Sequence, residues 1–370
     1  MNRIILLYGG NSVEHEISII TALQLKKSYK GKFNLCLCYL KNGYFYMSEK
    51  LEDLSIYKKN NFEKHLKKVE FKANQNYIFY NHKKISFLGV YLIVHGLNCE
   101  DGTLYSYFNT LNIPVIGENI YSACIGQNKI YSKMLTSVDS VPFFKITRNE
   151  ATFHLKDIFT KVKDFNYPLI IKPSTLGSSI GVYSVDNDEQ LEEKMTILFH
   201  LCDEIIVEKK IENFIELNIA VLKIQDKIIL SSIEKVSNNK VLTYEDKYIN
   251  EKKSMECLNK ELPAVIDDDL AYQIQDSAIK IYEDLNAKFI VRIDFLYDLK
   301  QQKLFFNEIN NIPGSLALYL FKNKGYDVNN LIDQCLEEGL FLNDLNLKKL
   351  TTYDQNIFKA NHLNQIKLEK

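Results

Sequence analysis

Alternating apolar and polar positions between residues 289 and 316 predict a β-hairpin late in the chain. In its first run the apolar residues Val291, Ile293 and Phe295 alternate with Arg292 and Asp294. Successive side chains of a strand point to opposite faces, so the two charged residues share one face and the apolar residues share the other. The second run follows a short polar turn, and its pattern assigns three residues to the back face: Phe305, Asn307 and Ile309.

A hairpin folded about residues 299–303 brings the polar faces of the two runs together. Asp294 then lies opposite Glu308, and Arg292 lies opposite Asn310. Two carboxylates and an amide oxygen form a hard oxygen site that suits Mg²⁺ bound together with phosphate. The adjacent guanidinium suits a carboxylate or an oxyanion. The alternative is the solvated face of an edge hairpin that contains a structural ion pair.

Strands that end at a glycine and lead toward a helix organise the first third of the chain. Apolar runs at 3–8 and 90–94 both follow this pattern. The alternation is typical of an open, mainly parallel sheet that binds its ligands at the carboxyl ends of the strands. That edge would carry Glu14 and His95; His95 is equally well explained as a capped core histidine.

Two local details of this region are also predicted. A helix over about 12–27 would begin with Asn11 as its N-cap and Glu14 as the reciprocal capping glutamate. A lysine-rich helix is expected near 58–68, among short aromatic strands. Charged residues of both signs accompany these lysines, so the stretch is interpreted as solvated surface.

Strands and helices continue to alternate over most of the remaining chain. Further strands are expected at 33–40, 44–47, 77–80, 167–171, 181–185, 204–207, 215–224 and 227–236, and helices at 188–200 and 270–286. Together these elements predict an α/β fold in which no internal repeat is visible.

Composition narrows the functional classes. The 370 residues exceed one typical core, so two or three domains are expected. Lys plus Arg number 46 and Asp plus Glu number 47, which gives no reason to expect a nucleic-acid partner. Seven cysteines without a CxxC pair indicate free thiols in a reducing cytoplasm. No apolar run is long enough for a signal peptide or a membrane span, so no membrane association is expected.

A Ser/Gly-rich loop, KPSTLGSSIG at 172–181, joins two predicted strands. Its small residues would let backbone N–H groups approach a phosphate, and Lys172 would reach the phosphate oxygens. The order of residues differs from a Walker A loop. A plain hairpin loop is the alternative interpretation.

Three further residues are candidates for nucleotide contacts. Glu208 stands at a strand exit, where it would accept a hydrogen bond from an adenine amino group, and Glu216 would bind a ribose hydroxyl. Lys247, with Tyr248, lies in a polar loop at 237–259 whose length is typical of a lid over a site. The alternatives are a surface charge cluster, a solvated carboxylate and a disordered connector.

In their order and spacing these segments resemble the D-alanine–D-alanine ligases, a family of the ATP-grasp superfamily. The resemblance extends from Gly9 to about Leu320 and includes GGNSVEHEIS at 9–18, HG at 95–96 with EDG at 100–102, and EK at 208–209. It implies a Rossmann-like N-terminal domain at 1–117, ATP-grasp subdomains of α+β type at 118–208 and 209–350, and a polar tail at 351–370.

The resemblance assigns roles in two amino-acid subsites. Glu14, hydrogen-bonded with Ser178 and Tyr248, would hold the ammonium of the first D-alanine, and His95 would lie near its carboxylate. Arg292 and the backbone N–H of Gly314 would bind the carboxylate of the second D-alanine or the developing oxyanion. Tyr319 and Leu320 are also expected to bind substrate. The family chemistry is attack of a carboxylate on ATP, followed by attack of an amine on the acyl phosphate.

The same resemblance implies ATP as co-substrate and two Mg²⁺ ions, with Mn²⁺ as a substitute. The metal ligands would be Asp294, Glu308 and Asn310. The expected ATP-binding residues are Lys129, Lys172, Gly177, Ser178, Ser179, Glu208, Lys209, Ile211, Glu216 and Lys247. Family analogy also implies a homodimer and a role in peptidoglycan precursor synthesis.

Several positions depart from the family pattern: Cys99, Tyr105, Ser106, Gln127, Asn128, Leu176, Lys210 and Tyr319. Tyr319 stands where many members have a serine that touches the second substrate, which leaves the acceptor preference open. Tyr248, in place of the histidine of depsipeptide-forming relatives, favours an amine nucleophile. The alternatives are an ATP-grasp ligase with another acceptor and a nucleotide-binding regulator without turnover.

Overall fold

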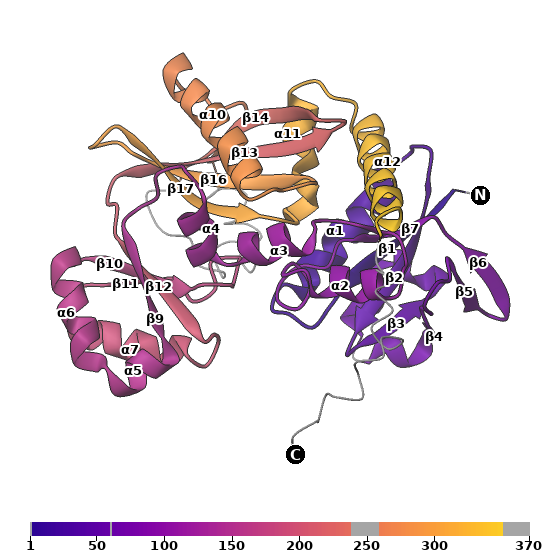
Figure 1. Cartoon of the computed structure of the whole chain (residues 1–370), viewed down its shortest axis with the longest axis horizontal. Coiled ribbons are helices and arrows are strands. Elements are labelled where there is room, and N and C mark those ends of the chain that lie inside the picture. The colour runs from indigo at the N-terminus through magenta and orange to yellow at the C-terminus, as the bar shows by residue number, and fades with distance from the viewer. Residues whose placement is uncertain (1, 60, 238–258, 351–370) are drawn as a thin grey trace, which may run out of the picture.

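The computed structural model describes residues 2–59, 61–237 and 259–350. These residues form sheets of six, four and five strands, together with one two-stranded hairpin. Figure 1 shows the three larger sheets as separate bodies, with the short helices α3 (Ile120–Gln127) and α4 (Lys129–Leu135) between them. Segments that are distant in the sequence therefore meet where these three bodies adjoin.

The first sheet has strand order β4-β3-β2-β1-β7-β8 and a parallel centre. Its strands are β1 (Arg3–Gly9), β2 (Asn34–Lys41), β3 (Tyr44–Met47), β4 (Lys67–Val69), β7 (Gly89–Leu92) and β8 (Val115–Ile116). Successive residues of β1 enter two different apolar cores, Leu6 on one face of the sheet and Leu7 on the other. The predicted parallel sheet, buried on both faces, is confirmed.

Two local predictions in this part of the chain are wrong. Helix α1 (His15–Ser28) begins after Glu14, which makes no capping bond, and Asn11 accepts a hydrogen bond from the N–H of Asn42 instead. The lysine-rich stretch forms 3₁₀ turns and edge strand β4, not a helix, because pairing with β3 outweighs local helix propensity. The other short elements are η1 (Glu49–Glu52), η2 (Leu54–Lys58), η3 (Phe62–His65), β5 (Tyr77–Tyr80), β6 (Lys83–Ser86) and α2 (Thr103–Thr110).

The second sheet is antiparallel, with strand order β11-β10-β12-β9, and three helices cover it. Its elements are β9 (Phe143–Thr147), α5 (Arg148–Phe153), α6 (Leu155–Phe165), β10 (Leu169–Pro173), β11 (Tyr183–Val185), α7 (Asp188–Leu198) and β12 (Glu204–Lys209). Strand β10 ends at the Ser/Gly-rich loop, so the sheet presents that loop at its edge.

The third sheet is also antiparallel, with order β15-β14-β13-β16-β17. Its elements are β13 (Phe214–Ile224), β14 (Lys227–Ser237), β15 (Asn259–Glu261), α10 (Asp268–Asp284), β16 (Val291–Asp298), β17 (Lys303–Asn310), η4 (Gly314–Ala317), α11 (Leu318–Asn323) and α12 (Val328–Leu347). Helix α10 covers one face through Ile274 and Ile281. Helix α12 returns to the first sheet, where Ile332 and Leu336 join the core of β1 (Figure 1).

The predicted hairpin register is confirmed in its polar part. Asp294 pairs with Glu308 and Arg292 pairs with Asn310. Beyond this point a β-bulge shifts the register, so that Phe295 pairs with Phe306. The prediction that Asn307 shares the apolar face is therefore wrong, because the bulge adds Asn307 to the polar side.

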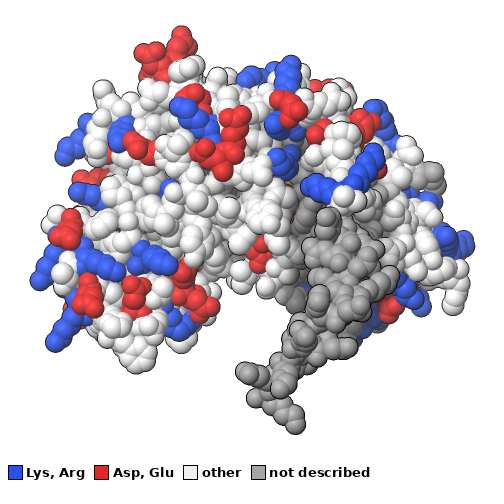
Figure 2. Space-filling view, in the orientation of Figure 1, with Lys and Arg blue, Asp and Glu red and all other residues white. Residues whose placement is uncertain are grey.

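Charged side chains of both signs are interspersed over the face of the molecule seen in Figure 2. This agrees with the near balance of the sequence charges. Among the residues that the structure describes, no helix is long and apolar enough to cross a bilayer.

Replacement of Leu336 by Ala tests the packing of α12 on the first sheet. The side chain is fully buried, so we expect a loss of about 2–5 kcal/mol in the free energy of unfolding. Leu345→Ala on the same helix, where the side chain is 42% exposed, should change it by less than about 0.5 kcal/mol. Denaturant unfolding measures both; equal losses would contradict the packing role of Leu336.

Candidate active site

Two adjoining cavities lie where the three sheets meet. The larger, about 370 Å³, lies between the second and third sheets, and the smaller, about 140 Å³, lies between the first and third. They share part of their lining, including Lys129, Gly177 and Glu308. A ligand group at this junction would therefore touch both spaces.

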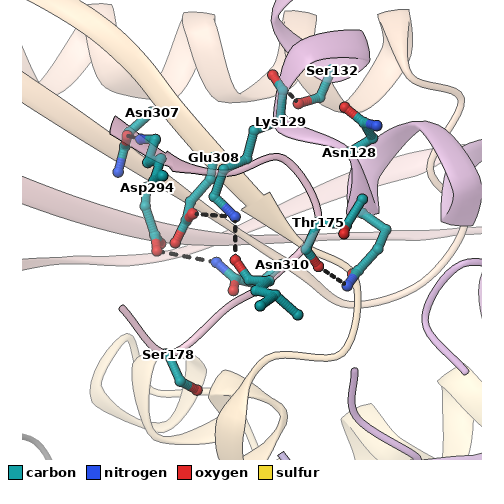
Figure 3. Close-up of polar contacts among 12 residues, drawn as sticks. Asn128, Lys129, Ser132, Thr175, Ser178, Asp294, Asn307, Glu308 and Asn310 are labelled. Carbon is teal, nitrogen blue, oxygen red and sulfur yellow. Dashed lines mark hydrogen bonds and ion pairs between the residues drawn. The ribbon is translucent and has the colours of Figure 1, made fainter. Parts of the chain in front are cut away.

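The polar face of the hairpin supplies the acidic wall of the smaller cavity. Arg292 binds both oxygens of Asp294 at 2.7 Å, and the Asn310 amide donates to Asp294 at 3.0 Å. Glu308 forms an ion pair with Lys129 at 3.2 Å (Figure 3). Burial opposes the charge of Arg292, but the Asp294 carboxylate outweighs this effect and raises the pKa of the guanidinium.

The donor set of this wall fits a divalent cation that is shared with a ligand. In the described part of the chain, no three His, Cys, Asp or Glu side chains gather as a complete metal site. The hairpin brings together two carboxylates and one amide, Asp294, Glu308 and Asn310, beside the cavity. Mg²⁺ keeps few protein ligands and completes its shell with water and phosphate oxygens, so this partial set suits it.

A buried trio of charges supports the wall of the larger cavity. Glu208 pairs with Lys172 at 2.8 Å and with Lys133 at 3.1 Å, and Lys172 also donates to Asn307 at 3.2 Å. Burial raises the pKa of Glu208, but the two ammonium groups outweigh it and lower the pKa to about 2. Burial lowers the pKa of Lys133 to about 8, against the opposing effect of Glu208.

These contacts give Glu208 a role that the sequence did not predict. Its carboxylate faces Lys172 and Lys133, so the side chain orients the two lysines, and its contact with an adenine amino group stays a prediction. The sequence signal for Lys133 was its place four residues after Lys129, which on a helix puts both on one face. The position of Asn307 on the polar face was not predicted, because the alternating pattern of the strand gives no sign of a bulge.

The junction of α3 and α4 holds the Ser/Gly-rich loop. Gln127 donates to the carbonyl of Thr175 at 2.7 Å, and Lys129 donates to that of Leu176 at 2.6 Å (Figure 3). Asn128 caps α4 by accepting hydrogen bonds from two backbone N–H groups. Gln127 and Asn128, which depart from the family pattern, therefore have structural roles: Gln127 holds the loop and Asn128 caps the helix. The loop itself lines both cavities.

The same loop reaches the first sheet through Glu14. Ser178 donates to Glu14 Oε1 at 2.7 Å, and a Cβ at Gly177 would lie 2.8 Å from that oxygen. A side chain at this position would therefore displace the Glu14 carboxylate. Burial raises the pKa of Glu14, although Ser178 and Lys129 oppose the effect.

Two more titratable groups line the smaller cavity. His95 is buried, its Nε2 has no hydrogen-bond partner among the described residues, and burial lowers its pKa to about 4. Glu100 was not singled out as a site residue. Burial, with a smaller contribution from Glu14, raises the pKa of its carboxyl to about 8.

Most remaining site predictions fall on the cavity walls. Glu216, Lys209, Ile211 and Ser179 line the larger cavity, and Gly314 lines the smaller. Lys247 and Tyr248 lie outside the described residues. The interpretation of 237–259 as a lid is therefore not tested.

Two residues predicted to bind the second substrate line neither cavity. The Leu320 side chain is fully buried in the core formed by α11, α12 and β13. Tyr319 lines neither cavity, and its hydroxyl donates to the buried Glu234 at 2.9 Å.

The fold and its two-cavity site define an ATP-grasp ligase architecture, and comparison with known structures agrees. VanG D-Ala:D-Ser ligase from Enterococcus faecalis matches with a TM-score of 0.75 and 26% identity, over 91% of this chain and 99% of that one. D-alanine–D-alanine ligase from Bacillus anthracis, solved in complex with ATP, matches in fold with a TM-score of 0.66 and 19% identity, over 94% and 100%.

Sequence comparison identifies the family within this architecture. Residues 3–118 match the D-ala D-ala ligase N-terminus, and residues 135–337 match the D-ala D-ala ligase C-terminus. The D-alanine–D-alanine ligase of Thermosipho melanesiensis is 34% identical over 368 residues, which cover 97% of this chain and 99% of that protein. The chain belongs to the D-alanine–D-alanine ligase family.

Substitutions in the buried trio test its charge balance. Glu208→Gln leaves two buried ammonium groups without their carboxylate, so we expect a loss of about 3–5 kcal/mol in the free energy of unfolding. Lys133→Met leaves Glu208 paired with Lys172, so that the remaining charges balance. The loss in the free energy of unfolding should therefore be clearly smaller than for Glu208→Gln. Denaturant unfolding at pH 7 compares the two variants. A larger loss for Lys133→Met would contradict the central position of Glu208.

Proposed function

We propose that the chain joins two D-alanines to D-alanyl-D-alanine at the expense of ATP, releasing ADP and phosphate, for peptidoglycan precursor synthesis. The observation that carries this proposal is the junction of the two cavities at Lys129 and Glu308. A phosphoryl group there would be in reach of an amino acid in the smaller cavity. Family membership supports the same reaction.

The larger cavity is assigned to ATP. Its apolar walls suit a purine, and Glu216 is proposed to bind the ribose. Lys129 and Lys172, with the backbone at Gly177 to Ser179, would bind the phosphates. Because Glu208 and Asn307 orient Lys172 from behind, its ammonium group is positioned before the nucleotide enters.

Asp294, Glu308 and Asn310 are proposed to hold two Mg²⁺ ions together with the phosphate oxygens. Bound there, the metal would neutralise the negative charge that develops in phosphoryl transfer. In the described structure Arg292 and Lys129 balance these carboxylates. With these carboxylates bound to the ions, Arg292 and Lys129 would be available to bind substrate oxygens.

The first D-alanine is assigned to the side of the smaller cavity that holds Glu14. Its ammonium would bind the Glu14 carboxylate, which Ser178 orients. Its carboxylate would lie near His95, whose pKa is lowered to about 4 by burial. A carboxylate oxygen then attacks the γ-phosphorus of ATP, the bond to ADP breaks, and an acyl phosphate forms.

The second D-alanine is assigned to the opposite side, beside Arg292 and Gly314. A Cβ at Gly314 would meet nothing within 4 Å, so there is space for a ligand next to its N–H. The amine attacks the acyl carbon, a C–N bond forms, and phosphate leaves as the amine loses its proton. Arg292 and the Gly314 N–H would stabilise the intermediate oxyanion.

A ligase with another acceptor is the second candidate, and it rests on Tyr319. Its hydroxyl is committed to Glu234, so an acceptor carboxylate would depend on Arg292 and backbone groups alone. VanG shows by its name that related chains use D-serine. We also propose, by family analogy, a cytoplasmic homodimer.

The deciding experiment measures phosphate release with Mg-ATP against D-alanine, D-serine, D-lactate and L-amino acids, with the mass of each product. We expect turnover with D-alanine and a dipeptide product. Preferred turnover with another acceptor would establish the second candidate. ATP binding without turnover on any substrate would instead indicate a nucleotide-binding regulator.

Glu308→Gln tests the acidic wall. Removal of one of the two carboxylates should lower the rate of ADP formation by roughly 100-fold or more, with little change in thermal stability. The matched control is Glu337→Gln, which removes a surface carboxylate paired with Lys32 and should retain activity. Wild-type turnover in Glu308→Gln would refute the proposed metal site.

A further inference from the structure

Glu100 contacts the backbone of two loops that border the smaller cavity from different sheets. Its Oε2 accepts a hydrogen bond from the N–H of Gly96 at 2.7 Å, and its Oε1 accepts one from the N–H of Ile312 at 3.1 Å. The residue is 8% exposed and lines the cavity. One buried carboxylate therefore joins the loop after β7 to the loop after β17.

On the first-sheet side this contact leads to Glu14. Ser12 Oγ donates to the carbonyl of His95 at 2.7 Å and accepts from the N–H of Glu14 at 3.2 Å. A Cβ at Gly96 would lie 2.5 Å from Ser12 Oγ and 3.3 Å from Glu14 Oε2, and Gly96 has a φ of +87°. The position of this glycine loop thus controls the position of the Glu14 carboxylate.

On the hairpin side the contact leads to Gly314. Ile312 lies two residues before it, and the intervening Pro313 restricts the backbone between them. Asn311 reinforces the same loop, because its amide donates to the carbonyl of Ala123 at 3.0 Å. A shift of the Ile312 N–H would therefore move the N–H of Gly314.

We propose that Glu100 is a positioning residue that couples the subsites for the two amino acids, an inference that rests on the proposed function. It acts through Glu14 on the subsite of the first D-alanine and through Gly314 on that of the second. Each of the two carboxyl oxygens of Glu100 accepts from one of the two N–H groups. An amide of the same shape would turn its NH₂ group toward one of them, so one loop would lose its anchor.

Glu100→Gln is therefore the test, with Asp101→Asn as matched control. The Asp101 carboxylate is adjacent in sequence but, among the described residues, accepts only from the N–H groups of Asn98 and Thr103. Initial rates of ADP release at saturating ATP, measured over a wide range of D-alanine concentration, give the Michaelis constants of the two subsites. In Glu100→Gln we expect these constants to rise roughly tenfold or more, with the KM for ATP within about twofold of wild type.

A merely structural role predicts a different pattern. The KM for ATP and the melting temperature would then change together with both D-alanine constants, and this result would overturn the proposal, as would wild-type constants in Glu100→Gln. If that variant does not fold, Glu100→Asp replaces it. The shorter carboxylate keeps the charge but cannot span both N–H groups, so the same selective rise is expected.

The experiment separates this inference from the proposed function. If the wild-type protein makes no dipeptide from D-alanine, the ligase assignment fails before any variant is compared. If the wild type is active and Glu100→Gln behaves like Asp101→Asn, only the role of Glu100 is refuted.

Discussion

The register of the β16–β17 hairpin is the constraint on which the site depends. Pairing of Asp294 with Glu308 places two carboxylates side by side, and the bulge at Asn307 then turns one additional polar side chain toward Lys172. A one-residue slip would exchange the polar and apolar faces of the hairpin. The packing of Phe306 under α10 and the acidic wall above it are therefore two consequences of the same pairing.

Compensation of buried charge is the second theme of the structure. Lys172 is held by Glu208, and Glu208 is balanced by Lys133, so the cation beside the larger cavity is supported by a buried counter-charge. Glu14 and Glu100 lie on the smaller cavity, where burial raises both pKa values. The larger cavity therefore presents a supported cation, Lys172, to a ligand. The smaller cavity presents two buried carboxyl groups, which favour an ammonium group.

Sequence patterns predicted the elements well where periodicity was strong and failed where a contact came from a distant element. The central strands and the α10 helix follow directly from alternation and helical spacing. The local pattern assigned Glu14 to a helix cap, whereas its hydrogen bond with Ser178, 164 positions away, was expected only from the family resemblance. Leu320 and Tyr319 were assigned to a pocket by resemblance, and only the structure shows that the Leu320 side chain is buried in the core and that the Tyr319 hydroxyl donates to Glu234.

The sequence by itself determined the α/β class, the parallel first sheet, the polar pairing of the hairpin and the family. These features arise from local periodicity and from motifs in a specific order, and both can be read directly from the sequence. Only the tertiary structure decided that Glu208 orients lysines, that Asn307 faces the larger cavity and that Glu100 joins two loops. The reason is physical: a side chain's partner depends on how separate sheets pack, and no local pattern contains that information.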